Sequence, residues 1–357
     1  MQLADGGMSE EWGEAGDLAA ARRLLCRQLL DHLDAVQPVL RSDIMQALAQ
    51  EGKLFHQPAT PLDGRWALVP FCLARTLCTH ADPARGAAAA LAMECLICAT
   101  DLFDDVMDED MTPLIACTGQ ARAVNVALAL LAFPQRILLS LAAQQSHTSV
   151  ALRLLDEVQR ALLQAVAGQQ WDVLAEGRLA CELSRDDCLA IAAAKAGSLL
   201  GLAWRLAVLC AEVGEAQVER CTGLGRQLGI AAQLDNDAHD LSHLLQPAAT
   251  GCQKSDLRRG KKTLPVVLAA RSLQATHPLS PTEIDHAFAH LPQLATREQE
   301  VYLAALREGI LTTWGLSLLY RERARESFHQ IMGNGPVAED VLQVLGLAEP
   351  LADINGW

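Results

Sequence analysis

Two clusters of acidic residues, each inside an alanine- and leucine-rich stretch of helical character, constrain this chain most. The first cluster runs from Asp101 to Asp110 and the second from Gln233 to Asp240. Positions 101, 104, 105 and 108 follow the spacing of one helix face, and positions 233, 236, 237 and 240 repeat that spacing. Like charges on one face repel each other, so each face must either point into water or bind cations.

The chemistry of these side chains favours a cation. An acidic run on a single helix is usually a solvated face, but two clusters with matching spacing on separate helices favour a shared role. Oxygen ligands without interleaved His or Cys select a hard ion, and Mg²⁺ is the expected one. The chain has five lysines among its 29 basic residues, and four of them, suited to phosphate, lie between or just after the clusters. These are Lys195, Lys254, Lys261 and Lys262.

Composition excludes several classes of function. A net charge of −14 argues against nucleic acid or an anionic membrane surface as a partner. The apolar stretches 121–145 and 189–213 are interrupted by charged residues, so they are predicted to be buried helices and not transmembrane segments. Eleven cysteines lack the spacing of a zinc site, and Cys95 and Cys98 are read as small core residues of a reduced, cytoplasmic protein.

The helical pattern predicts an all-α fold without strand-like alternation. Residues 1–16 are acidic and glycine-rich and are expected to be disordered. Residues 17–332 are expected to form one large helical bundle in which the two acidic helices face each other across a central cavity. Residues 333–357 are expected to be a C-terminal tail with a short helix.

From about residue 85 to 270, the order and spacing of motifs resemble the trans-isoprenyl diphosphate synthases of the polyprenyl synthetase superfamily. The run from Glu94 to Asp108 is similar to their first aspartate-rich motif, and Gln233 to Asp240 to their second. The remaining matches are Gly168-Gln169 with Asp172, Lys195 with Ala196 where Thr is usual, and the segment from Lys254 to Pro265.

Several departures from that family bear on function. Elongating members bind a second diphosphate, that of isopentenyl diphosphate, with a basic Gly-Lys-x-x-Arg-Pro segment, for which the nearest counterpart here is Gly64-Arg65. The family also has paired arginines after the first motif, whereas residues 111–118 contain no basic side chain. Asn236 opens the second motif as in terpene cyclases, but Asp240 and Leu244 depart from the cyclase pattern.

The resemblance implies a class I reaction in which Mg²⁺, expected as three ions in the family pattern, helps an allylic diphosphate to ionise. It also implies that small residues before the first motif admit a C15 or C20 tail, although close helix packing would use the same residues. The expected metal ligands are Asp104, Asp105, Asp108, Asn236, Asp237 and Asp240. The expected diphosphate ligands are Lys195, Gln233, Lys254 and Lys261, and the expected tail pocket is Ala99, Cys98 and Phe103.

What captures the allylic cation separates the functional hypotheses. The favoured one is a terpene synthase, similar to the isoprenyl-synthase-like terpene synthases, which cyclises or eliminates. The alternatives are prenyl transfer to a non-isoprenoid acceptor, such as a peptide tryptophan, and chain elongation as a prenyl diphosphate synthase; a non-catalytic subunit is the remaining reading. The expected partners are a small prenyl diphosphate and a second copy of the chain in a homodimer.

Overall fold

The computed structural model of this protein describes residues 18–57, 64–78, 80–245 and 256–332, together with 341, 342 and 345. Every regular element within these ranges is helical, which confirms the predicted all-α class. The predicted disordered N-terminus, 1–16, lies outside the described residues, as does nearly all of the predicted tail 333–357. The proposed boundaries between these regions stay predictions.

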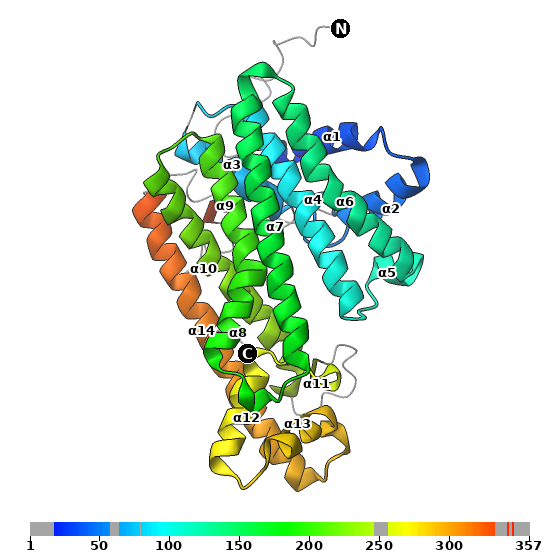
Figure 1. The fold of residues 1–357 in the computed structure, drawn as a ribbon, viewed down its shortest axis with the longest axis vertical. Coiled ribbons are helices and arrows are strands. Elements are labelled where there is room, and N and C mark those ends of the chain that lie inside the picture. Colours follow the sequence, from blue (N-terminus) through cyan, green and yellow to red (C-terminus); the bar gives the residue numbers. More distant parts are fainter. Residues whose placement is uncertain are drawn as a thin grey trace. The chain divides into compact units, whose positions relative to one another are not determined.

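The chain divides into two compact units. Unit 1 comprises residues 1–159, 202–222 and 328–357, and unit 2 comprises residues 160–201 and 223–327. Four helices, α7, α9, α10 and α14, contribute residues to both units (Figure 1).

Unit 1 is built around α4, a long helix whose first two thirds are buried. Asp82 caps its N-terminus by accepting a hydrogen bond from Ala84 N at 2.8 Å, and Pro83 occupies the first helical position. α3 and α6 pack against α4, and Figure 1 shows α4 and α6 side by side. The helices of this unit before α7 are α1 Leu18–Leu33, α2 Pro38–Leu48, α3 Arg65–Leu77, α4 Pro83–Met107, α5 Pro113–Thr118, α6 Gln120–Ala142 and η1 Gln145–His147.

Unit 2 has two core clusters of aliphatic side chains, one centred on α12 and α13 and one beneath α8. Its helices pack through buried Leu, Val and Ile residues, as their spacing along each helix predicts. The remaining helices of the chain are α7 Thr148–Glu176, η2 Ala180–Glu182, α8 Arg185–Ala192, η3 Ala193–Gly197, α9 Ser198–Cys210, α10 Glu215–Asp240, η4 Ser242–Leu245, α11 Asp256–Arg259, α12 Leu264–Thr276, α13 Pro281–Ala289, η5 Leu291–Gln293 and α14 Thr296–Met332.

Three helical stretches are long and apolar enough, by length and composition, to cross a membrane: Pro83–Met107, Gln120–Ala142 and Arg185–Cys210. In the first, 83% of the most apolar window is buried inside the protein, so its apolar character is explained by the core of unit 1. In the second stretch, 44% of the most apolar window is buried, and Leu128 and Leu139 are exposed. The expectation that no segment crosses a membrane stays a prediction.

Candidate functional site

The first acidic cluster lies where α4 ends. Asp110 N donates to Asp105 O at 2.8 Å and Glu109 N donates to Val106 O at 3.3 Å. This pair of bonds is the Schellman arrangement, which ends a helix with a left-handed residue, here Glu109 with φ of 56°. The chain therefore stops the helix immediately after Asp108 and keeps Asp104, Asp105 and Asp108 in its final turn.

These three carboxylates are half-buried, and Oδ1 of Asp104 is fully buried. Their position is electrostatically costly, because the carboxyl end of a helix carries partial negative charge. No basic residue lies in the last turn of α4 to offset it. A cation would stabilise carboxylates that share such a helix end, and the expectation that these three bind metal stays a prediction.

Lys53 is a functional candidate that sequence reasoning missed. Its ammonium group pairs with the carboxylate of Asp101, the first residue of the acidic face, and its side chain is only 8% exposed. Burial opposes the charge on Lys53, but the nearby carboxylates, led by that of Asp101, outweigh it and raise the pKa of this ammonium. Lys53 is therefore held as a cation beside the first cluster.

The segment that carries Lys53 is anchored by buried hydrogen bonds. Leu54 N donates to Glu94 Oε1 at 2.7 Å, and Arg22 donates to Leu54 O at 2.9 Å and to His56 O at 2.7 Å. Burial raises the pKa of Glu94, although Lys53 and the bond from Leu54 oppose the rise. These bonds fix the backbone that follows Lys53, at Leu54 and His56.

The segment around Lys53 lies beside the segment in which the resemblance places the second diphosphate. Gly64 N donates to Gly52 O at 3.1 Å, so the backbone of Gly52-Lys53 lies next to that of Gly64-Arg65, where α3 begins. Two basic residues are therefore carried on adjoining stretches of backbone, separated in sequence by residues 54–63. The signal available in the sequence was the Gly-Lys pair itself in a chain with five lysines.

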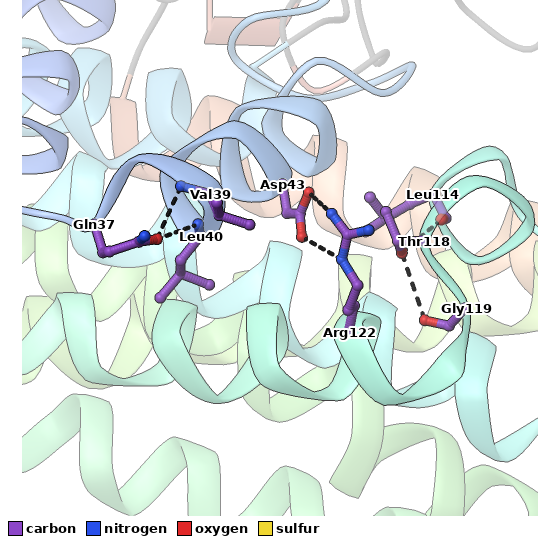
Figure 2. A network of polar contacts seen from close by, with 8 residues as sticks. All are labelled: Gln37, Val39, Leu40, Asp43, Leu114, Thr118, Gly119 and Arg122. Atoms are coloured by element: carbon purple, nitrogen blue, oxygen red, sulfur yellow. Dashed lines mark hydrogen bonds and ion pairs between the residues drawn. The ribbon is translucent and has the colours of Figure 1, made fainter.

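The first arginine after the acidic cluster is Arg122, and it is already engaged. Figure 2 shows its guanidinium on the carboxylate of Asp43, with Nε donating to Oδ2 at 3.0 Å and Nη2 to Oδ1 at 2.7 Å. This two-pronged pair joins α6 to α2, and the Asp43 side chain is 9% exposed. Arg122 therefore holds unit 1 together, and the family's arginines after the first motif have no replacement here.

The second acidic cluster lies in the final turn of α10. Asn236 is exposed, whereas Asp237 and Asp240 are half-buried. Gln233 Nε2 donates to Asp237 Oδ1 at 2.9 Å, so the predicted diphosphate neighbour also orients a predicted metal ligand. Asp235 pairs with Arg321 of α14, which removes Asp235 from the cluster.

Two lysines of unit 2, Lys195 and Lys262, form ion pairs with different aspartates. Lys195 Nζ donates to Asp172 Oδ2 of α7 at 2.6 Å, with both side chains largely covered. Lys262 Nζ lies 3.1 Å from Asp285 Oδ2, and Asp285 also accepts from Ala180 N, so Lys262 joins α13 to its neighbours. Lys261 is half-buried, and the predicted ligand Lys254 lies outside the described residues. The diphosphate roles of these lysines stay predictions.

The donor groups of both clusters suit magnesium. Each cluster offers carboxylate or amide oxygens at the negative end of a helix. Among the described residues, no three Asp, Glu, His or Cys side chains gather closely enough to hold a metal ion by themselves. Mg²⁺ typically takes one or two carboxylates and completes its shell with water and substrate phosphates, so this donor set fits an ion that arrives with a diphosphate.

The predicted tail-pocket residues lie on α4, upstream of the cluster. Cys98 and Ala99 are buried and Phe103 is half-buried. Burial raises the pKa of the Cys98 thiol to about 12, which makes it an inert, apolar side chain at neutral pH. Residues that line a pocket and residues that pack against a neighbouring helix would both be covered in this way. The tail pocket therefore stays a prediction.

Comparison with known proteins gives the family. A family model described as "Polyprenyl synthetase" matches residues 41–289, which is more than half of the chain. Among curated proteins, geranylgeranyl diphosphate synthase of Mycobacterium tuberculosis is 32% identical over 179 residues, covering 48% of this chain and 49% of that protein. Nonaprenyl diphosphate synthase of the same organism is 28% identical over 267 residues, covering 72% and 73%.

Comparison with solved structures gives the fold. A polyprenyl synthetase from Streptomyces coelicolor A3(2) has a TM-score of 0.70 and 23% identity, covering 92% of this chain and 97% of that one. At this identity the likeness establishes the helical fold alone. The first curated relative is matched over about half of its length, so the activity of that whole protein is not carried over as a finding.

Proposed function

The chain belongs to the polyprenyl synthetase family, and from this premise we propose that it is a magnesium-dependent prenyl diphosphate synthase that elongates an allylic diphosphate with isopentenyl diphosphate. The observation that carries the proposal is the meeting of Gly52-Lys53 with Gly64-Arg65. That contact places two residues with cationic side chains on adjoining backbone, beside the segment with which elongating family members hold the second diphosphate. The curated relatives that match are prenyl diphosphate synthases as well.

The proposed reaction begins with ionisation of the allylic substrate. The bond between its C1 and the diphosphate oxygen breaks, and the diphosphate leaves with the electron pair. Asp104, Asp105, Asp108, Asn236, Asp237 and Asp240 are the proposed ligands that would hold Mg²⁺, and the ion would supply positive charge to the leaving diphosphate.

Carbon–carbon bond formation follows. The double bond of isopentenyl diphosphate supplies the electron pair for the new bond to C1, and the resulting cation then loses a proton to the released diphosphate, which leaves a new double bond in the product. In this proposal Lys195 and Lys261 hold the allylic diphosphate, whereas Lys53 and Arg65 hold the second diphosphate. Ordered anchoring of the segment around Lys53 by Glu94 and Arg22 keeps the second group of cations in place.

A terpene synthase is the second candidate, because a specific observation favours it. Asp101 already neutralises Lys53, Asp43 already neutralises Arg122, and residues 111–118 contain no cation. Less positive charge then remains for a second diphosphate than elongation usually employs. In that case the allylic cation would close on itself or lose a proton, and isopentenyl diphosphate would not be consumed.

One set of incubations separates the two candidates. The protein is incubated with Mg²⁺ and C10, C15 or C20 allylic diphosphate, with and without isopentenyl diphosphate, and both the organic extract and released diphosphate are measured. Elongation predicts longer prenyl diphosphates that require isopentenyl diphosphate. Hydrocarbon or alcohol products that form equally well without it would instead establish the terpene synthase.

Two lysine variants sharpen this test. Lys53→Met should lower consumption of isopentenyl diphosphate about tenfold or more, because a charge-assisted contact is lost, while release of diphosphate from the allylic substrate alone persists. Lys262→Met is the matched control, since its side chain is also 8% exposed and also pairs with an aspartate. Equal effects of both variants on consumption would mean that Lys53 acts only through folding.

A further inference from the structure

The helix that carries Lys195 contains one irregular turn. From Arg185 to Cys210 the chain is helical throughout, but Ala193–Gly197 forms a single π-turn, η3, between α8 and α9. A π-turn accommodates one extra residue, so it rotates the side chains that follow and leaves backbone carbonyls without their usual partners. Such a turn persists only where its surroundings support it, and three contacts in unit 2 do so.

Ser198 supports the π-turn from within the helix. Its hydroxyl lies 2.6 Å from Ala194 O and 2.9 Å from Lys195 O, and the side chain is buried. The Ser198 hydroxyl therefore lies within hydrogen-bond distance of two carbonyls of the irregular turn, one of which belongs to Lys195 itself. Serine elsewhere in a helix interior can bond back to the preceding turn, and here that bond falls on the π-turn.

Two glycines enclose the π-turn from the neighbouring helices. A Cβ added to Gly168 of α7 would lie 2.7 Å from Lys195 N and 2.8 Å from the carbonyl carbon of Ala194. A Cβ added to Gly229 of α10 would lie 2.4 Å from Ala196 O and 2.5 Å from Gly197 Cα. The atoms in the way belong to the backbone, so only glycine allows α7 and α10 to approach this closely.

The same two helices carry the groups that surround Lys195 in function. Asp172, one turn after Gly168, accepts the hydrogen bond from Lys195 Nζ. Gln233, one turn after Gly229, donates to Asp237. The carboxylates of Asp237 and Asp172 also contribute, after burial, to the raised pKa of Cys188, which lies two turns before Lys195 on the same helix. The glycine contacts therefore set the distance from the π-turn to α7, which carries Asp172, and to α10, which carries Asp237.

We propose that Gly168, Gly229 and Ser198 are positioning residues for diphosphate binding. They hold the π-turn, and the π-turn directs the Lys195 ammonium group toward the diphosphate that the second acidic cluster binds through magnesium. The inference rests on the proposed role of Lys195 within the proposed function, but it is the same for elongation and for cyclisation. A regular α-turn at 193–197 would rotate Lys195 away from Asp172 and weaken diphosphate binding without removing the lysine.

Ser198→Ala is the decisive variant, because it adds no atoms and removes the hydroxyl that serves the two carbonyls. Its affinity for inorganic pyrophosphate with Mg²⁺ is measured by calorimetry on the full chain, together with the free energy of unfolding in urea. The affinity should fall about fivefold to tenfold, as expected for the loss of a directing hydrogen bond. The pyrophosphate affinity of Gly229→Ala should fall at least as far. Gly223→Ala is the control on the same helix, because a Cβ there meets no atom within 4 Å, and its pyrophosphate affinity should stay within about twofold of wild type.

A double-variant cycle distinguishes positioning from simple destabilisation. If Ser198 acts by directing Lys195, Ser198→Ala should have no further effect on pyrophosphate affinity in a Lys195→Met background. An equal loss in both backgrounds, or wild-type affinity of Ser198→Ala, overturns the proposal, and so does wild-type protein that does not bind pyrophosphate. Pyrophosphate binding that depends on Lys195, without consumption of isopentenyl diphosphate, would overturn the proposed function and leave this inference standing.

Discussion

The two acidic helix ends solve the same electrostatic problem differently. At the end of α4 the neighbouring lysine, Lys53, pairs with Asp101, which belongs to the acidic face itself. In unit 2, Lys195 pairs with Asp172 of α7, which lies outside the second cluster. Unit 1 therefore uses part of its acidic face to hold a cation, whereas unit 2 holds its cation with a carboxylate from another helix. Lys53 can be released only by changing the charge of the face that is predicted to bind metal.

The largest expected effect comes from removing one predicted metal ligand in either unit. Asp104→Asn and Asp237→Asn should each reduce diphosphate release from an allylic substrate by about a hundredfold or more, with the helical circular dichroism unchanged. Asp235→Asn is the matched control on α10, because Asp235 pairs with Arg321 and lies outside the predicted ligand set. Substantial turnover by either ligand variant would break the parallel between the two helix ends.

A smaller effect should distinguish the two lysine pairs. Asp101→Asn frees Lys53, so the KM for isopentenyl diphosphate should fall about two- to fivefold, in line with the modest energy of a partly exposed ion pair. Asp172→Asn should instead leave that KM unchanged and weaken pyrophosphate binding, because Asp172 holds Lys195 in place. Steady-state kinetics with each substrate varied in turn test both statements. An unchanged or higher KM in Asp101→Asn would mean that Lys53 binds no second diphosphate.

The smallest expected effect is a pH dependence confined to unit 1. Burial raises the pKa of Glu94 in the folded chain above its usual value of 4.5, so the stability that its proton provides is full below that pH and declines as pH rises. Glu94→Gln does not titrate, so its stability relative to wild type should increase as pH rises above that value. Urea unfolding at several pH values measures this difference. A constant difference would show that Glu94 titrates normally.

Much of the architecture follows from periodicity. The first acidic helix spans 83–107, and the spacing selected the carboxylates of Asp104 and Asp105 in its final turn and of Asp108 at its C-cap. Helix ends shift because Glu109 adopts a left-handed conformation that no glycine announces. Lys53 could not be predicted as a site candidate, because residues 54–63 separate it in sequence from Gly64-Arg65. The hydrogen bond from Gly64 N to Gly52 O, which shows that the two stretches are neighbours, is visible only in the structure.

The π-turn was equally invisible in the sequence. The run from Ala193 to Gly197 carries no signal in its sequence that distinguishes it from a turn of regular helix. The irregular turn depends on backbone contacts with Gly168 and Gly229, which are distant in sequence from it and lie within otherwise ordinary helices. Helical spacing describes which face a residue occupies, but it carries no information about how closely two helix backbones approach.

The placement of both acidic clusters at carboxyl helix ends has a consequence for the dynamics of the chain. Repulsion within the last turns of α4 and α10 lowers the free energy of opening those turns, so their amide hydrogens should exchange faster than those at the uncharged end of α6. Under the proposed function, Mg²⁺ that arrives with a diphosphate would bind the closed turns and not the open ones, so it should reverse this order. Slower amide exchange at these two helix ends, on addition of Mg²⁺ and pyrophosphate together, would then report occupancy of the two clusters residue by residue.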